Sequence, residues 1–237
     1  MTDSGTPPMP TMPTAVVSRR QLQLVLLLDC SGSMAGEKIA SLNYAIRSAL
    51  SELRAAAEEN PEIDVRLSAL KFSTGAEWHI DTPTPIDDLQ WVDLAAGGET
   101  AMGQALDMTV DFFNSGKFSG RQLPPIVLLV TDGYATDDFD TSFENFMQHE
   151  AAKCAMRIAI AIGDSADEDA LRIFVDTEKT GIAPLCARSA PDLVKHIKWA
   201  TTAPVKATSS PTNAPSSVEG LAQDTNRLLA DDSEIVW

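Results

Sequence analysis

Basic residues are scarce in this chain of 237 residues, and they form no cluster. Lys and Arg number 18 against 34 Asp and Glu, which gives a formal net charge of −16 at pH 7. A protein that holds a nucleic-acid backbone by releasing its counterions needs a concentrated basic surface. The composition therefore argues against nucleic acid as a partner.

Cysteines and long apolar runs are also few. The three cysteines, Cys30, Cys154 and Cys186, are an odd number at wide spacing, which excludes a complete disulfide framework and offers no zinc pattern. No apolar run approaches the roughly 18 residues of a membrane span. Residues 1–14 lack the basic and apolar regions of a secretory signal. We therefore expect a reduced, cytoplasmic protein with no membrane segment.

Between residues 21 and 200, strand and helix patterns alternate. Residues 22–28 are a short apolar run, typical of a central strand buried on both faces. Residues 37–58 carry apolar side chains three and four positions apart, which predicts an amphipathic helix. Further strands are predicted over residues 65–72, 75–80, 126–130, 156–162 and 182–186, and further helices over 100–113, 139–153, 167–175 and 191–200.

This alternation predicts one α/β domain with a doubly wound, mostly parallel sheet and helices on both faces. The segment at residues 75–80 follows a tight Ser-Thr-Gly turn, so it is expected to be a lone antiparallel edge strand. We place this domain at residues 21–200.

The remaining segments are distinguished by composition. Residues 1–20 contain four prolines and little that could fill a core, which predicts a flexible leader. Residues 201–217, rich in Thr, Ser, Pro and Ala, are interpreted as a flexible linker. Residues 218–237 regain apolar side chains among acidic ones, and we interpret them as a short docking segment that binds its own domain or another chain. The alternative is a solvated terminus with incidental leucines.

Polar side chains gather where predicted strands end or helices begin. One group follows the strand at residues 22–28, a second precedes the helix at 100–113, and a third follows the strand at 126–130. Ligands of parallel α/β sheets bind outside the carboxyl ends of the strands, so these three loops are expected to meet. The candidate metal ligands in them are Asp29, Ser31, Ser33, Thr100 and Asp132. Carboxylates and hydroxyls are hard oxygen donors, which favours Mg²⁺ or Mn²⁺ over zinc.

Several of these residues have an ordinary structural alternative. Thr100 is well placed to be the N-cap of its helix, and Asp132 to form a turn before the glycine that follows it. Asp137 and Asp138 are expected to cap the helix that comes after them. Cys30 lies between candidate ligands, and its side chain is expected to point into the core as a small apolar group.

The three motifs resemble the metal-ion-dependent adhesion site of von Willebrand factor A domains. Asp-x-Ser-x-Ser, a Thr after a Gly pair, and Thr-Asp-Gly match that site at every position, in the right order. The resemblance extends over about residues 22–200. It implies a module that binds a protein partner through Mg²⁺, with the partner supplying a carboxylate to the ion.

The order and spacing are also similar to the bacterial TerY-type proteins of tellurium-resistance and stress gene clusters. That likeness rests on Thr-Asp-Gly at 131–133, Thr-Asp-Asp at 136–138 before Phe139, and Ile-Lys-Trp at 197–199. It implies partners from such a cluster, including a Ser/Thr kinase and a phosphatase.

Catalytic motifs are missing around the same loops. Neither a P-loop nor a nucleophile elbow fits the residues after Gly32, and no pair of nucleophile and base is visible. We therefore expect no enzyme. A metal-assisted phosphohydrolase remains an alternative, although a general base near Asp29 is lacking. A structural domain with a vestigial site is a further alternative.

Overall fold

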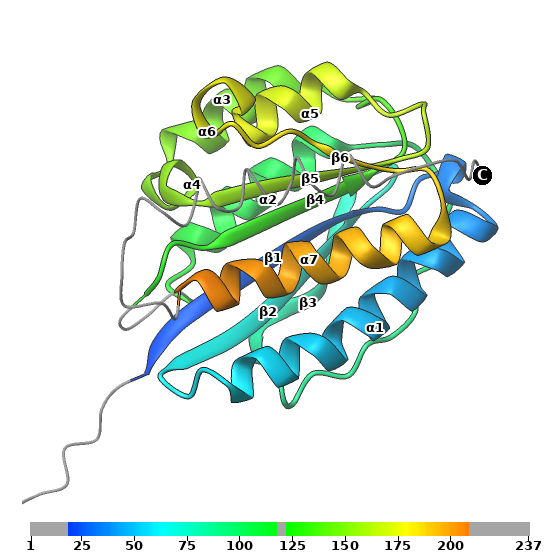
Figure 1. The fold of residues 1–237 in the computed structure, drawn as a ribbon. Helices are drawn as coiled ribbons and strands as arrows, with labels where there is room; N and C mark the ends of the chain where they lie inside the picture. The colour runs from blue at the N-terminus through cyan, green and yellow to red at the C-terminus, as the bar shows by residue number, and fades with distance from the viewer. Residues whose placement is uncertain (1–18, 118–121, 209–237) are drawn as a thin grey trace, which may run out of the picture.

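The computed structural model describes residues 19–117 and 122–208. Its core is a six-stranded sheet in the order β3-β2-β1-β4-β5-β6 (Figure 1). The strands are β1 (Arg20–Asp29), β2 (Ile63–Phe72), β3 (Ala76–Pro85), β4 (Ile126–Thr131), β5 (Met156–Ile162) and β6 (Leu185–Ala187). Only the pairing of β2 with β3 is antiparallel among these strands. The predicted doubly wound, mostly parallel sheet with one antiparallel edge strand is confirmed.

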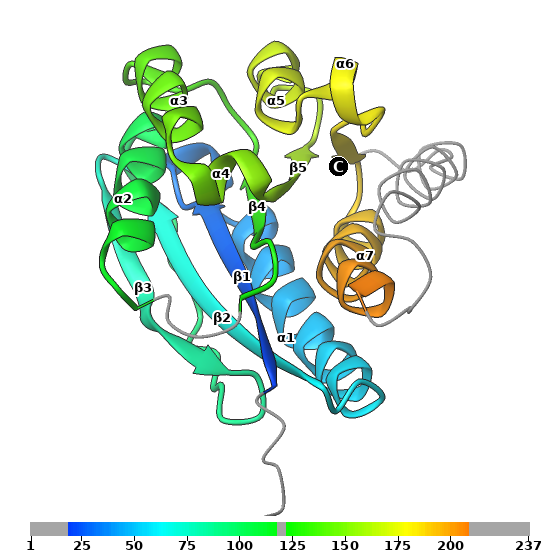
Figure 2. The same ribbon diagram turned by 90° about the vertical axis from the view of Figure 1, so that its left-hand side faces the viewer.

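Helices cover both faces of the sheet. The α-helices are α1 (Glu37–Glu58), α2 (Met102–Asn114), α3 (Phe139–Gln148), α4 (Glu150–Cys154), α5 (Glu168–Val175), α6 (Thr177–Thr180) and α7 (Ala190–Thr208). Figure 2 shows α1 and α7 on one side of the sheet and α2 and α3 on the other. None of the helices within the described residues is long and apolar enough to cross a membrane.

The central strand β1 is buried on both faces because its side chains alternate between two apolar cores. Leu26 packs in the cluster that contains Leu42 of α1, whereas Leu27 packs in the cluster that contains Leu106 of α2. All four leucines are at most 1 % exposed. A strand with a helix layer on each side needs apolar residues at every position, which explains the unbroken apolar run.

One predicted helix is divided in two. We expected a single helix over residues 139–153, but the chain extends at His149, where ψ is 133°. The His149 ring accepts a hydrogen bond from the Ala151 amide at 3.1 Å, so it caps α4. Side-chain capping in the middle of an apolar repeat is invisible to periodicity, and the single helix was a wrong prediction.

The last helix is longer than expected. Residues 201–208, which we assigned to the linker, form the final turns of α7. Val205 is 1 % exposed and belongs to the core beneath α1, so burial of apolar surface extends the helix through a Thr/Ala-rich stretch. Most of the leader, the rest of the linker and the docking segment lie outside the described residues.

Candidate metal centre

Three loops meet at the carboxyl end of the central strands. Strands β1 and β4 are parallel neighbours, with Leu28 opposite Val130, so Asp29 and Asp132 emerge side by side. The loop before α2 is held against them by backbone hydrogen bonds. The Gly32 amide donates to the Gly98 carbonyl at 2.9 Å, and the Gly97 amide donates to the Cys30 carbonyl at 2.8 Å. The expected meeting of the loops is present in the structure.

Gly98 makes the close approach of the third loop possible. Its φ is +89°, a region that side-chain-bearing residues rarely adopt. A Cβ at this position would lie 2.4 Å from the hydroxyl oxygen of Thr74 and 3.0 Å from the Thr74 amide nitrogen. The second glycine of the pair is therefore required by both conformation and space.

A chain of short polar contacts joins the predicted ligands. The Ser31 and Ser33 hydroxyl oxygens are 2.9 Å apart, and the Ser33 hydroxyl donates to Asp132 Oδ1 at 2.6 Å. The Ser31 amide donates to Asp29 Oδ1 at 2.7 Å. A Cβ placed on the adjacent Gly133 would be 3.9 Å from both the Ser33 Oγ and the Thr100 Oγ1. All five predicted residues thus face one small region.

Thr100 does not cap its helix. The N-cap of α2 is Ala101, which makes no side-chain cap. Instead, the side chain of Asp137, from the loop after β4, caps the start of α2. Its carboxylate accepts hydrogen bonds from the Gly103 amide at 2.9 Å and the Gln104 amide at 2.8 Å. The expectation that Asp137 caps the helix following it was wrong, because its carboxylate reaches across to α2.

Asp138 is the residue that caps α3, by accepting from the Thr141 amide at 3.2 Å, as expected. Thr136 also joins its loop to the loop before α2, through its backbone amide and its side-chain hydroxyl. The Thr136 amide donates to the Thr100 carbonyl at 2.9 Å, and the Thr100 amide donates to the Thr136 hydroxyl at 3.1 Å. Within the part of the chain that the structure describes, the Thr100 hydroxyl has no hydrogen-bond partner.

Burial dominates the electrostatics of the site. Asp29 is 0 % and Asp132 1 % exposed. Burial raises the pKa of Asp29, hydrogen bonds from Thr131 and Ser31 oppose that shift, and the charge of Asp132 adds to it. Burial, with the charge of Asp29, also raises the pKa of Cys30 to about 12. Cys30 is 2 % exposed and lies in the apolar core, which confirms that it is a neutral packing group.

Two polar residues of the site were missed by the sequence analysis. Thr131, the last residue of β4, donates its hydroxyl to Asp29 Oδ2 at 2.6 Å. Lys38, in the first turn of α1, places its ammonium nitrogen 2.6 Å from Asp132 Oδ2. The available signals were a threonine directly before the Asp-Gly pair, and a cation at the start of a helix, where the helix dipole disfavours it.

The donor set fits a hard divalent cation. Neighbouring ligands in a Mg²⁺ octahedron, at metal–oxygen distances of about 2.1 Å, lie roughly 3 Å apart. The contacts from Ser31 Oγ to Ser33 Oγ and on to Asp132 Oδ1, at 2.9 and 2.6 Å, are close to that spacing. The described residues contain no group of three or more His, Cys, Asp or Glu that could hold a metal. Two carboxylates with three hydroxyls are the ligands that Mg²⁺ or Mn²⁺ prefers.

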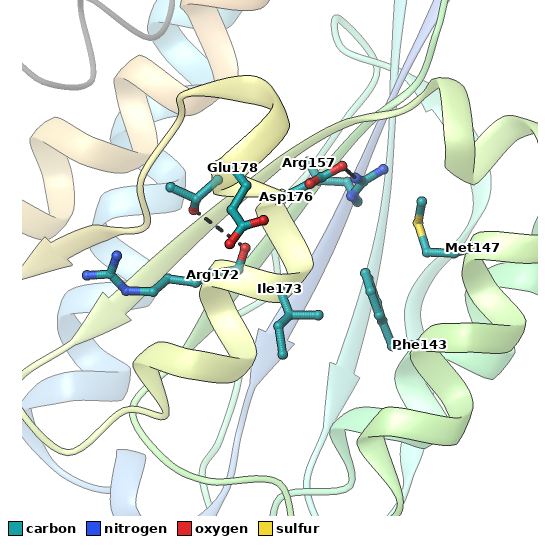
Figure 3. A pocket seen from close by; sticks show the side chains of 8 residues that line it. Phe143, Met147, Arg157, Arg172, Ile173, Asp176 and Glu178 are labelled. Carbon is teal, nitrogen blue, oxygen red and sulfur yellow. Dashed lines mark hydrogen bonds and ion pairs between the residues drawn. The ribbon is translucent and has the colours of Figure 1, made fainter.

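A separate pocket of about 540 Å³ lies between α3 and α5. In Figure 3, Phe143 of α3 and Ile173 of α5 lie on opposite sides of it. The Arg157 guanidinium beside it donates to the Phe174 carbonyl at 2.6 Å and the Ala152 carbonyl at 3.0 Å, so this arginine ties helix ends together. Because Arg157 is near the amino end of β5, the pocket is remote from the candidate metal centre.

Several solved structures share this architecture. A von Willebrand factor type A protein from Catenulispora acidiphila is 17 % identical with a TM-score of 0.59, over 80 % of this chain and 43 % of that chain. Proximal thread matrix protein 1 from the mussel byssus, in a structure with a zinc-occupied MIDAS motif, is 16 % identical with a TM-score of 0.57, over 78 % of this chain and 48 % of that one. The ArnB paralog VWA2 from Sulfolobus acidocaldarius is 20 % identical with a TM-score of 0.53, over 76 % and 45 %.

The chain spans less than half the length of each of these three proteins. At such identities the likeness shows the fold alone. A comparison with curated proteins found no match. The family model described as the von Willebrand factor type A domain matches residues 23–185, a stretch that includes all three loops of the candidate metal centre. The chain therefore belongs to the von Willebrand factor type A domain family.

Proposed function

We propose that this protein is a Mg²⁺-dependent protein-interaction module and not an enzyme, with Mn²⁺ able to replace Mg²⁺. The observation that carries the proposal is the meeting of two buried carboxylates and three hydroxyls from three loops. Asp29, Ser31, Ser33, Thr100 and Asp132 are the proposed ligands. The bound ion supplies a positive charge that neutralises Asp29 and Asp132 and attracts an anionic group from outside.

The surface around the site supports binding of another protein. Ser33 is exposed although its hydroxyl contacts buried Asp132, so an ion held here is reachable from solvent. Tyr134, two residues after Asp132, is 65 % exposed. An exposed aromatic ring beside a charged centre is typical of the residues that dominate protein interfaces. We propose that the partner supplies a carboxylate oxygen to the ion and packs against Tyr134.

One solved structure, the chemistry of the ligands and the sequence motifs support finer parts of this proposal. The mussel protein, whose structure has a zinc-occupied MIDAS motif, is a precedent for a divalent ion in the same fold. The absence of His and Cys ligands from the five proposed positions favours Mg²⁺ here. We further propose, from the resemblance of residues 131–139 and 197–199 to TerY-type proteins, a cytoplasmic partner from a bacterial stress-response cluster, such as a Ser/Thr kinase or phosphatase.

Calorimetric titration with MgCl₂ tests the metal site. We expect about one ion per chain, and we expect Asp29→Ala to abolish binding. The variant should remain folded in chelator because it removes one of two neighbouring buried carboxylates. Asp93→Ala is the matched control, since Asp93 is an exposed carboxylate paired with Arg47. Mg²⁺ binding by Asp29→Ala at wild-type affinity would refute the ligand assignment.

Capture of the partner tests the interaction. Immobilised protein is incubated with bacterial lysate in Mg²⁺, and the retained proteins are compared with those retained in excess chelator. We expect a partner that is lost with chelator and with Asp29→Ala, and weakened by Tyr134→Ala. A complex that forms equally well without the ion would contradict the proposal, and a site with no effect on any partner would indicate a structural role.

A further inference from the structure

A lysine occupies an electrostatically unfavourable position at the start of α1. Lys38 is the second residue of that helix, where the free amide groups and the helix dipole favour anions. Its side chain is nevertheless 26 % exposed and directed at the Asp132 carboxylate, whose side chain is 0 % exposed. The helix does not explain a cation at this position, whereas the buried carboxylate does.

Asp132 is fully engaged in the structure. Its Oδ1 accepts from the Ser33 hydroxyl, and its Oδ2 accepts from the Lys38 ammonium at 2.6 Å. Asp29 differs, because its oxygens accept from the Ser31 amide and the Thr131 hydroxyl, which are neutral donors. Lys38 thus supplies the one positive charge in direct contact with a proposed ligand among the described residues. Removing the ammonium group from this pair would leave the buried Asp132 carboxylate uncompensated and would destabilise the folded state.

We propose that Lys38 is a tethered cation that neutralises Asp132 when the site holds no ion and leaves Oδ2 when a divalent ion binds. The inference rests on the proposed function, because it concerns the same metal site. A divalent ion at Oδ1 and an ammonium group at Oδ2 of the same carboxylate repel each other, so binding of the ion favours release of Lys38. Lys38 therefore weakens the affinity of the site and sets the ion concentration at which it fills, while it keeps the metal-free protein folded.

Titration of Lys38→Gln with MgCl₂ tests the inference. Gln keeps a similar side-chain length without the charge, and we expect the ion to bind at least about tenfold more tightly than to wild type, or ~1.4 kcal/mol. Lys38→Arg keeps the charge and should retain weak binding. Lys198→Gln is the matched control, since Lys198 is 27 % exposed and lies 2.7 Å from Glu52, in an ion pair between α7 and α1. Its affinity should stay that of wild type.

A measurement on the wild-type protein does not depend on how the variants fold. Acetylation of lysines by an activated ester, followed by mass spectrometry, reports how accessible each amine is. We expect Lys38 to react slowly in chelator and faster in saturating Mg²⁺, because the ion displaces it from Asp132. Lys198 serves as the internal reference and should react at the same rate in both conditions.

The outcomes separate this inference from the proposed function. If neither wild type nor Lys38→Gln binds Mg²⁺, the metal site itself is refuted. If wild type binds and Lys38→Gln binds equally or less tightly, the role of Lys38 is refuted while the metal site stands. If Lys38→Gln does not fold, the acetylation rate decides: an unchanged rate for Lys38 in Mg²⁺ overturns the inference, and an increased rate supports it.

Discussion

The hydroxyl of Thr131 gives a direct measure of the charge on Asp29. Thr131 is 0 % exposed and donates to Asp29 Oδ2 at 2.6 Å. Thr131→Val replaces that hydroxyl by a methyl group of similar shape, and a β-branched residue suits the end of β4. The substitution leaves a buried carboxylate oxygen without its donor and removes a longer 3.3 Å hydrogen bond from the Gly133 amide, while the packing is nearly unchanged.

The magnitude follows from the nature of the acceptor. A hydrogen bond to a charged group contributes about 1.5–3 kcal/mol to stability, and short charge-assisted bonds are the stronger ones. We expect Thr131→Val to lower the free energy of unfolding by about 2 kcal/mol in chelator at pH 8. For a domain of this size that corresponds to a fall in Tm of roughly 4–8 °C. Mg²⁺ affinity should also fall about tenfold, because the ligand loses its orienting partner.

A second buried threonine provides the control. Thr109 of α2 is also 0 % exposed, but its hydroxyl donates to the neutral Ala105 carbonyl at 2.7 Å. Thr109→Val should therefore cost only about 0.5–1 kcal/mol. Urea unfolding of both variants in chelator gives the comparison. Equal losses of stability in the two variants would refute the reasoning, because Asp29 would then not be a charged acceptor in the folded protein.

Two further predictions concern the loop before α2 and the edge strand. Gly98→Ala should lower the free energy of unfolding by about 2–4 kcal/mol, because φ is +89° and the new Cβ would meet Thr74. Gly97→Ala should be nearly neutral in the same denaturation assay, since nothing lies within 4 Å of its Cβ position. Burial lowers the pKa of His79, against the opposing effect of its hydrogen bond to the Val92 carbonyl. The neutral ring is therefore favoured in the folded state, and stability should fall as the pH drops below about 6.5 through the lowered pKa. In urea unfolding at pH 5–8, His79→Gln should flatten this dependence, and an unchanged slope would contradict it.

The sheet and its order of elements were predictable because periodicity reports burial. The apolar run in β1 indicates a strand buried on both faces, and the three-and-four spacing in α1 indicates an amphipathic helix. Helix α1 has the predicted bounds, Glu37–Glu58. Periodicity failed where contacts distant in sequence decide the outcome. Val205 extends α7 because it fits the core, and His149 interrupts a helix by capping the next one.

The candidate site was predictable for a different reason. Parallel strands bring their carboxyl ends together, so residue type and position after a strand were enough to gather Asp29 and Asp132, whereas Thr100 was placed by its position before a helix. The contacts around them were not predictable, because they depend on side-chain reach between loops. The Asp137 carboxylate caps α2, and the Lys38 ammonium contacts Asp132. Each contact joins residues far apart in the sequence, so no local sequence pattern predicts it.

The candidate metal centre is assembled from three loops that are distant in sequence, and this determines the stage of folding at which it can form. Its two carboxylates come together only after β1 pairs with β4, with Leu24 opposite Ile126. Because such long-range pairing is slow to form, we expect it to come late in folding. An unfolded chain keeps Asp29, Ser31 and Ser33 close together but separates them from Thr100 and Asp132, so an ion that needs all five ligands stabilises the native state. Interactions that are absent from the folding transition state slow unfolding without accelerating folding. Under the proposed function, the divalent-ion concentration governs how long a folded molecule persists and leaves the rate at which it forms unchanged.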